Sequence, residues 1–497
     1  MSCIQKHLLV SLSPEGMNVR LGENLGIRYL KSYLESFGFY IDILEVHSNN
    51  ESSDFFKSVI RDYDTIGFSL NFCGQVSRLK KILRDIDMDK KIIYLGGHVA
   101  TFCYKNLMHD FSEVKFVVVS EGEISMLRLF QSGFTYQNVA NIAYRVDDNI
   151  IINNPIKFVE NLDELPFPYR DEKSYFMGDK HFSMISSRGC YHSCSYCSVG
   201  SYTKKFLDCR VRFRSAENVL EEIEHVHKKY GVTHISFQDD LFLDVDAKSQ
   251  NRAKKISELL LARDINVFFS IMCSVKAINE EVISLLYNAG LRNVFIGIEN
   301  FSEKARAYFN KHISDKDIEH AISVLATIGV EVDFGFIMFY PEMKHEEILL
   351  NVSRLYELNL INLRSISNAL SIYIGTEYET RIIDSIVVNR DDYVVQWRFR
   401  DELLNDLLNK YRIFSSKYKK QENQLAWLRF HSYTNTEIDG EYVYQLSTAF
   451  RNFIYEFAVS NYNFIFMEAQ APDIINHYVP LINDIEQYYQ KINHSAD

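Results

Sequence analysis

Short apolar runs alternate with amphipathic segments along the first 135 residues of the chain. Five runs have the length and composition of strands: residues 8–11, 40–44, 65–70, 91–95 and 114–119. Apolar residues recur at helical spacing over residues 23–37, 75–87 and 121–130. Strands that alternate with helices form a parallel sheet covered by helices on both faces. We therefore expect residues 1–135 to form a doubly wound, Rossmann-like α/β domain.

The rest of the 497-residue chain divides into three further parts. Residues 136–180 predict a hairpin (139–145 and 149–153) followed by a linker, because Pro166 and Pro168 interrupt regular structure. Alternation of strands and helices resumes at residue 181 and predicts a full or partial (β/α) barrel over residues 181–370. Residues 371–497 predict a mostly helical C-terminal region that covers the barrel mouth and selects the substrate.

Three of the eight cysteines lie within eight residues. Cys190, Cys194 and Cys197 are spaced C-x3-C-x2-C, directly after the predicted strand 182–186. Three thiolates at this spacing can each bind a different iron of a [4Fe-4S] cluster and leave the fourth iron open for another ligand. A zinc knuckle completed by His192 is an alternative, as are three unrelated cysteines. His192 lies inside the motif, so its side chain would have to fold back onto the same metal.

Over about residues 182–342 the chain resembles the radical S-adenosylmethionine (SAM) superfamily. The resemblance implies that the three cysteines hold [4Fe-4S], that SAM chelates the fourth iron, and that Tyr196 contacts the adenine. It also implies a carboxylate, Asp239 or Asp240, that accepts hydrogen bonds from the SAM ammonium group. An Asp at the end of a strand can equally cap the next helix.

Two further segments carry the resemblance. Residues 297–300 match the Gly-Ile-Glu-Ser pattern of the family, which implies that Glu299 faces the SAM ribose; a buried, paired carboxylate is the alternative. Arg212 and Arg214 precede Ser215, as in the family's Arg-x-Arg-Ser stretch, and either steady a carboxylate or phosphate of SAM or pair with acidic neighbours. The chain departs from the family at residues 339–342, where the Gly-rich turn is absent.

The first domain resembles the cobalamin-binding domain that precedes the radical SAM core in one large subgroup. The landmarks are residues 21–26, 96–98 and 120–123. The resemblance implies cobalamin contacts from Leu25, Gly26, Asn71, Gly96, Gly97, His98, Glu121, Gly122 and Glu123. The two glutamates can instead cap a helix. The Asp-x-His-x-x-Gly signature is absent, so His98 is not predicted to ligate cobalt, and residues 71–73 are expected below the corrin. A domain that keeps the fold but not the cofactor is the alternative.

Together these features predict a cobalamin-dependent radical SAM enzyme, resembling the class B methyltransferases, that methylates an unactivated carbon or phosphorus. The alternatives are rearrangement, cyclisation or oxidation without methyl transfer, and a non-catalytic cobalamin- or cluster-binding sensor. The substrate class stays open between a natural-product intermediate, a peptide and a lipid precursor. Such an enzyme needs an external electron donor such as flavodoxin or ferredoxin.

The charge balance bears on partners and location. Acidic residues outnumber basic ones, 66 to 54, and the formal charge of −12 argues against nucleic acid as a partner. No secretory signal or apolar run long enough to span a membrane is visible, so we expect a cytoplasmic protein.

Overall fold

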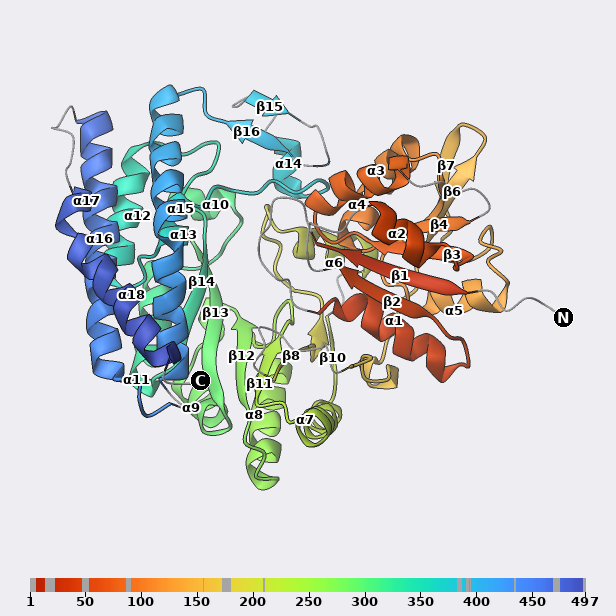
Figure 1. Cartoon of the computed structure of the whole chain (residues 1–497), viewed down its shortest axis with the longest axis horizontal. Coiled ribbons are helices and arrows are strands. Elements are labelled where there is room, and N and C mark those ends of the chain that lie inside the picture. The colour runs from red at the N-terminus through yellow and green to blue at the C-terminus, as the bar shows by residue number, and fades with distance from the viewer. Residues whose placement is uncertain are drawn as a thin grey trace.

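A seven-stranded sheet forms the N-terminal part of the computed structural model (Figure 1). Its strand order is β2-β1-β3-β4-β5-β6-β7; the first five strands are parallel, and β6 and β7 are antiparallel. The bounds are β1 (His7–Leu12), β2 (Asp42–Val46), β3 (Thr65–Ser69), β4 (Ile92–Gly96), β5 (Val114–Val118), β6 (Ile142–Val146) and β7 (Asn149–Ile152). The doubly wound domain expected from the sequence is confirmed.

The structure describes residues 6–13, 23–46, 53–85, 91–154, 156–171, 180–208, 211–381, 387–389, 393, 395–432, 435–467 and 474–494. Residues 21 and 22 of the first cobalamin-domain landmark lie outside these ranges.

Helices cover both faces of this sheet. α1 (Leu25–Ser36) and α5 (Glu123–Gln131) pack together on one face, and α2 (Ser53–Ile60), α3 (Gly74–Asp85) and α4 (His98–Asp110) lie on the other (Figure 1). The sequence did not predict α2 or α4. α4 is kinked at Cys103, and its buried positions include Val99, Ala100 and Thr101 in succession, so it lacks a clear helical periodicity.

The hairpin expected over residues 139–153 is present as β6 and β7. It differs from the expectation in its place, because β6 pairs with β5 and so extends the first sheet. Residues 156–171, with the short 3₁₀ helix η1 (Leu162–Glu164), then lead towards the second domain.

The second domain is a five-stranded parallel sheet in the order β14-β13-β12-β11-β8. Each β-α unit adds the next strand beside the previous one, which makes a partial barrel. The strands are β8 (His181–Met184), β11 (His234–Phe237), β12 (Phe268–Cys273), β13 (Leu291–Glu299) and β14 (Glu331–Phe336). The helices that alternate with them are α7 (Ala216–Tyr230), α8 (Ala247–Ala262), α9 (Glu280–Asn288) and α11 (Asp315–Ile328).

Smaller elements decorate this core. They are β9 (Ser187–Arg188), β10 (Arg212–Phe213), α6 (Ser198–Phe206), η2 (Val275–Ala277), α10 (Glu303–Tyr308), α12 (Glu346–Glu357), α13 (Leu363–Ser367) and α14 (Glu377–Arg381). β9, directly before the three clustered cysteines, pairs in an antiparallel fashion with β10, which follows α6.

The C-terminal part is mostly helical, as expected, and packs beside the core (Figure 1). It contains the hairpin β15 (Val387–Asn389) and β16 (Gln396–Arg398), and the helices α15 (Glu402–His431), α16 (Gly440–Phe466), α17 (Ile474–His477) and α18 (Val479–His494). The Trp397 indole N–H donates to the Leu370 carbonyl at 2.8 Å, and Trp427 stacks on His431. Both tryptophans therefore serve packing.

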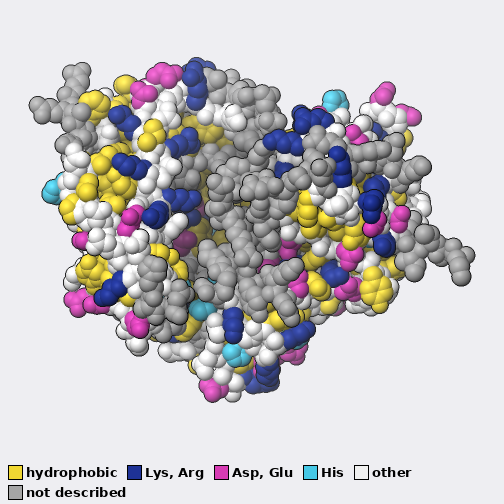
Figure 2. All heavy atoms as spheres, in the orientation of Figure 1, with side chains coloured by type: hydrophobic (Ala, Val, Ile, Leu, Met, Phe, Trp, Pro, Cys, Tyr) yellow, Lys and Arg dark blue, Asp and Glu magenta, His cyan; other side chains and the backbone are white. Residues whose placement is uncertain are grey.

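Two further observations concern the expected partners. On the face drawn in Figure 2, acidic and basic side chains of the described residues are interspersed. Within the described ranges, no helix combines the length and hydropathy needed to cross a bilayer.

Candidate cofactor site

The three cysteines lie on a loop that begins with a turn at Gly189 (φ +95°) and ends at α6, where Cys197 is the N-cap residue. Backbone contacts fix the loop. The Ser195 N–H donates to the Phe309 carbonyl at 3.0 Å and the Ser195 hydroxyl to the Tyr308 carbonyl at 2.7 Å, while the Tyr378 N–H donates to the Ser195 carbonyl at 2.8 Å. The loop is therefore held in shape by its own protein contacts.

All three cysteines are free and half-buried. Burial, with smaller contributions from charges on Cys194 and Cys197, raises the pKa of the Cys190 thiol to about 12. Such thiols ionise when a metal binds them as thiolates. Among the described residues, no three His, Cys, Asp or Glu side chains converge on a single-ion site. His192 instead pairs with Asp244 at 3.2 Å. This pairing argues against His192 as the fourth ligand of a zinc ion, whereas three thiolates are enough for a cubane with one open iron.

The two adjacent aspartates after β11 have different surroundings. Asp239 is fully buried and accepts hydrogen bonds from the Ser186 N–H at 2.8 Å and the Ser187 hydroxyl at 2.6 Å. Asp240 accepts one hydrogen bond from the Gly189 N–H at 3.0 Å and lines a cavity between the two sheets, which is described below. Burial raises the pKa of Asp240 to about 6. Asp240 is thus the carboxylate with free acceptor capacity, and the helix cap of α8 is Asp246.

Glu299 ends β13 with a positive φ of +67° and pairs with Lys311, Oε1 to Nζ, at 3.3 Å. Gly297 makes room for this pair, because a Cβ there would lie 2.4 Å from Glu299 Oε1 and 2.6 Å from Lys311 Nζ. Burial opposes the charge of Lys311, but Glu299 and then Cys194 outweigh it and raise its pKa. A buried ammonium group therefore faces the cysteine loop. The Tyr196 side chain packs edge-on against Phe309 and is hydrogen-bonded to Glu299.

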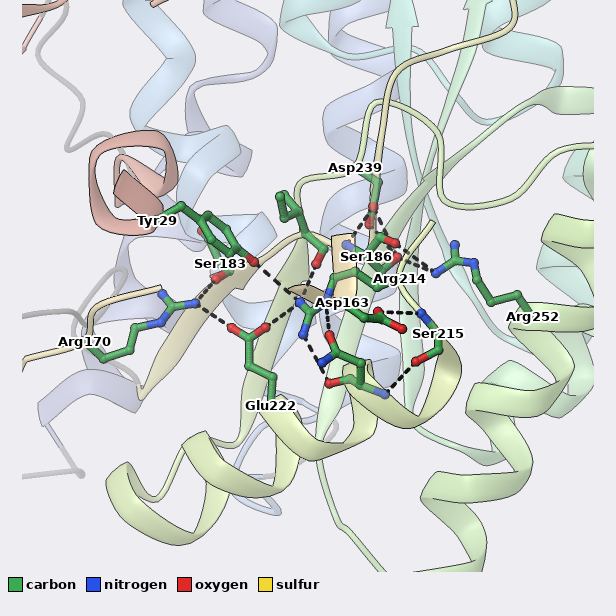
Figure 3. Close-up of polar contacts among 12 residues, drawn as sticks. Tyr29, Asp163, Arg170, Ser183, Ser186, Arg214, Ser215, Glu222, Asp239 and Arg252 are labelled. Atoms are coloured by element: carbon green, nitrogen blue, oxygen red, sulfur yellow. Dashed lines mark hydrogen bonds and ion pairs between the residues drawn. The ribbon is translucent and has the colours of Figure 1, made fainter. Parts of the chain in front are cut away.

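Arg214 belongs to a buried network behind the strand ends, shown in Figure 3. It donates to the Ile185 carbonyl at 2.7 Å and pairs with Glu222, which is fully buried. Glu222 also contacts Arg170 at 3.4 Å, and Arg170 pairs with Glu23 of the first domain. These contacts occupy the Arg214 guanidinium outside the cavity, so they favour a framework role over the predicted contact with SAM.

One cavity of about 860 Å³ lies between the two sheets, at the carboxyl ends of the parallel strands. All nine residues predicted to contact cobalamin line it: Leu25, Gly26, Asn71, Gly96, Gly97, His98, Glu121, Gly122 and Glu123. Of the residues predicted for SAM, Asp240 lines the same cavity. Tyr196, Asp239, Glu299 and Arg214 are not among its lining residues.

Glu121 and Glu123 bridge the two domains. Arg188, two residues before Cys190, contacts Glu121 at 3.0 Å and Glu123 at 2.8 Å, and Arg212 also pairs with Glu121. The glutamates are thus bound to arginines of the core. Their predicted contacts with cobalamin amides stay a prediction.

Gly97 and His98 form the cavity wall at the start of α4. Gly97 has φ +98°, and a Cβ there would lie 2.7 Å from the Leu70 carbonyl oxygen. The His98 ring stacks on Tyr202 of α6 at 5.1 Å, and its buried Nε2 has no hydrogen-bond partner. Burial lowers the pKa of His98 to about 4, so the ring is neutral. Phe72 lines the cavity and is 43% exposed, as expected of a segment that faces a bound cofactor.

Part of the cavity lining lies on the face of the first sheet that α1 and α5 cover, and we call this part of the cavity the shaft. Small residues in register on three strands, Ser11, Ser69 and Gly96, line its upper part. One layer deeper, Leu9, Gly67 and Tyr94 line its floor, where the Tyr94 hydroxyl is buried without a partner. A cavity at the strand ends whose lining contains unpartnered polar atoms fits cobalamin, which combines a flat macrocycle with a nucleotide loop.

A family model described as the radical SAM superfamily matches residues 184–352, and one described as a B12 binding domain matches residues 20–130. The chain belongs to the cobalamin-binding radical SAM family. Its cofactors are accordingly a [4Fe-4S] cluster, SAM and cobalamin.

Among proteins similar to this radical SAM enzyme is an uncharacterised methyltransferase of Pyrococcus horikoshii, 24% identical over 82% of this chain and 88% of the relative. Cytidylyl-2-hydroxyethylphosphonate methyltransferase of Streptomyces wedmorensis is 23% identical over 64% of this chain and 69% of the relative. Among solved structures, the cobalamin-dependent SAM radical enzyme OxsB has a TM-score of 0.73 at 17% identity and covers 99% of this chain and 80% of its own. Radical SAM methyltransferase TsrM of Kitasatospora setae has a TM-score of 0.61 at 15% identity over 75% of this chain and 74% of its own.

Sequence reasoning missed three residues of this site in the radical SAM enzyme. Lys311 follows α10 without any motif, and Arg188 was treated only as part of the cysteine segment. Tyr94 had the appearance of an ordinary strand residue. None had a local signal, because each acquires its role from partners that lie in other elements.

Proposed function

We propose that this enzyme methylates an unactivated carbon, or a phosphorus, of a natural-product, peptide or lipid-type substrate. The observation that carries the proposal is the shared cavity, which has Gly96, Gly97 and His98 on one wall and Gly189 and Asp240 on the other. A cobalamin and a SAM bound there would face the same substrate. Relatives named as methyltransferases support this reaction.

When bound, the cluster and SAM supply a 5′-deoxyadenosyl radical, and methylcobalamin supplies the methyl group. The protein holds and orients these groups. Cys190, Cys194 and Cys197 would bind three irons, and the Asp240 carboxylate would accept hydrogen bonds from the SAM ammonium group. Lys311, beside Glu299, would place a positive charge near the SAM carboxylate.

The two domains are joined beside the cavity. The Arg188 contacts to Glu121 and Glu123 join the cysteine loop to the cobalamin-domain loop across one edge of the cavity. Positioning of this kind is the main contribution that a protein makes to cofactor-driven radical chemistry. We assign no general base, because the cofactors carry the chemistry.

The test uses protein purified and reconstituted without oxygen, then incubated with reductant and SAM that carries a deuterated methyl group. We expect about four irons per chain, bound corrinoid, 5′-deoxyadenosine, and the deuterated methyl group on cobalamin. The Cys190→Ala variant is the control for cluster-dependent cleavage. Formation of 5′-deoxyadenosine without methylation of cobalamin would contradict the methyltransferase proposal and favour rearrangement, cyclisation or oxidation. Intact SAM would favour a sensor.

A further inference from the structure

The shaft lies where one face of the first sheet carries small side chains. In the layer nearest the strand ends, Ser11, Ser69 and Gly96 are neighbours in register. The opposite face of the same strands carries Val10, Phe68 and Leu95, which are buried. Side chains alternate between the two faces of a strand, so the small residues all lie on the face under α1 and α5.

The polar side chains in the upper part of the shaft already have hydrogen-bond partners within the protein. Asn24, the N-cap residue of α1, donates from its amide group to the hydroxyls of Ser11 at 2.9 Å and Ser69 at 3.1 Å. Leu30 of α1 and Met126 of α5 add apolar surface on the helix side.

Tyr94 lies at the floor of the shaft and leans across the neighbouring strand. A Cβ at Gly67 would lie 2.4 Å from Tyr94 Cε2 and 2.5 Å from Cζ, so the ring rests directly over Gly67 and points towards Leu9 of β1. Phe116 stacks on the ring from the other side, with centroids 5.1 Å apart and planes 10° from parallel. The orientation of the ring is therefore fixed by packing.

The Tyr94 hydroxyl is an unsatisfied donor in this position. It is buried and has no hydrogen-bond partner in the protein. Burial also raises the pKa of Tyr94, so the hydroxyl keeps its proton. An unpartnered buried hydroxyl costs about 1–3 kcal/mol, and buried tyrosines normally find an acceptor. Leu9 and Gly67, which lie beside the end of the ring, offer no side-chain acceptor.

We propose that the Tyr94 hydroxyl donates a hydrogen bond to the aromatic base at the end of the cobalamin nucleotide loop. The base of cobalamin, dimethylbenzimidazole, has one ring nitrogen that accepts a hydrogen bond when it is not bound to cobalt. Tyr94 then makes this enzyme select corrinoids whose base carries such a nitrogen. The inference rests on the cofactor and not on the reaction that is catalysed.

The test compares three corrinoids by anaerobic absorbance titration of the cofactor-free protein. They are cobalamin, a cobamide whose lower base is a phenol without a ring nitrogen, and cobinamide, which lacks the nucleotide loop. The base of cobalamin must leave cobalt to accept this bond, whereas a phenol has no cobalt bond to break, so the two affinities are compared as a ratio. We expect the ratio of the cobalamin affinity to the phenolic cobamide affinity to be about tenfold higher in the wild type than in a variant without the hydroxyl, as one hydrogen bond would give. An equal ratio in both proteins would overturn the proposal.

The variant Tyr94→Phe keeps the ring over Gly67 and removes only the hydroxyl. We expect it to lose about tenfold in cobalamin affinity and to bind cobinamide and the phenolic cobamide as the wild type does. Tyr144→Phe is the matched control, because its hydroxyl donates to the Gln137 carbonyl and lies outside the cavity lining. A preference for cobalamin that survives in Tyr94→Phe would overturn the assignment. If the wild type bound neither cobalamin nor cobinamide, cobalamin would be contradicted as the cofactor of this protein. That outcome differs from a change in base selectivity.

Discussion

At the scale of single residues, the site depends on which of two similar side chains is free. Asp239 and Asp240 are adjacent, yet Asp239 accepts from Ser186 and Ser187 and lies near Arg252, whereas Asp240 accepts only from Gly189 among the described contacts. A carboxylate whose acceptors are all taken stabilises the fold. One with spare acceptors in a cavity can bind a ligand.

This contrast gives a paired prediction. Asp240→Asn removes the negative charge from the cavity, so we expect SAM cleavage to fall at least about tenfold with an unchanged melting temperature. Asp239→Asn leaves the buried Arg252 without its charge partner, and we expect it to lower the free energy of unfolding by about 2–4 kcal/mol. Measurement of 5′-deoxyadenosine and thermal denaturation distinguishes the two. Equal effects of both substitutions on stability would contradict the assignment.

His98 gives a prediction about pH. Its pKa falls from 6.5 to about 4 in the folded protein because the ring is buried. The unfolded chain therefore binds more protons between these pH values, and stability is lost as the pH falls through this range. The variant His98→Phe keeps the stacking on Tyr202 but cannot take up this proton. Between pH 7 and pH 4.5 we expect its free energy of unfolding to fall by on the order of 2 kcal/mol less than that of the wild type.

Chemical denaturation of the cofactor-free protein at several pH values measures this effect. The control is His109→Gln on the same helix, whose side chain is 86% exposed and should follow the wild type. Parallel pH profiles for His98→Phe and the wild type would disprove the role of His98.

At the scale of elements, the two-residue strand β9 helps to join the two domains. It pairs with β10, so Arg188 and Arg212 lie side by side and face the loop after β5. Burial of Glu123 is compensated mainly by Arg188, whose charge helps to lower the pKa of that carboxyl against the effect of desolvation. The pairing of two small strands thus joins two domains.

We expect Arg188→Gln to lower the free energy of unfolding by about 3 kcal/mol, because it leaves a buried carboxylate uncompensated. Arg188→Lys should restore only part of the loss, since an ammonium group cannot form the forked contact. Urea denaturation measures both. Arg263→Gln breaks an exposed pair with Glu224 and should change stability by less than about 0.5 kcal/mol. A similar, small effect at both arginines would show that the bridge does not stabilise the fold.

At the scale of the whole molecule, the cysteine loop and the cobalamin domain keep their shapes through separate contacts. Ser195 ties the loop to residues 308 and 309 and to Tyr378. Loss of the cluster should therefore leave the cobalamin chamber intact. The two cofactor sites meet at the shared cavity and at the contacts of Arg188 with Glu121 and Glu123.

We expect the triple variant Cys190→Ala, Cys194→Ala, Cys197→Ala to contain no iron and to bind cobalamin within about twofold of the wild-type affinity. Saturating cobalamin, at about 100 times its Kd, should stabilise both proteins by about 2.7 kcal/mol. Iron analysis and thermal denaturation with and without cobalamin provide the readouts. Loss of cobalamin binding in the triple variant would show instead that the cluster organises the whole cavity.

The sequence by itself determined the fold class, the order of the domains and the position of the cysteine motif. Periodicity and motif spacing are local properties, so they can be recognised directly in the sequence. Two of the elements that it missed are α2, which is only 8 residues long, and α4, which lacks a clear helical periodicity. It also placed nine residues around one cavity, because landmarks at the ends of parallel strands necessarily meet at one edge of the sheet.

Only the tertiary structure decided which side chains are free. It directed Arg214 to Glu222, bound Glu121 and Glu123 to arginines of the second domain, and left Asp240 in the cavity. It also brought Lys311 to Glu299 and laid the Tyr94 ring over Gly67. The physical reason is that burial and pairing depend on neighbours far away in sequence. Arg188 and Glu123, for example, are 65 residues apart. No local pattern encodes such a contact.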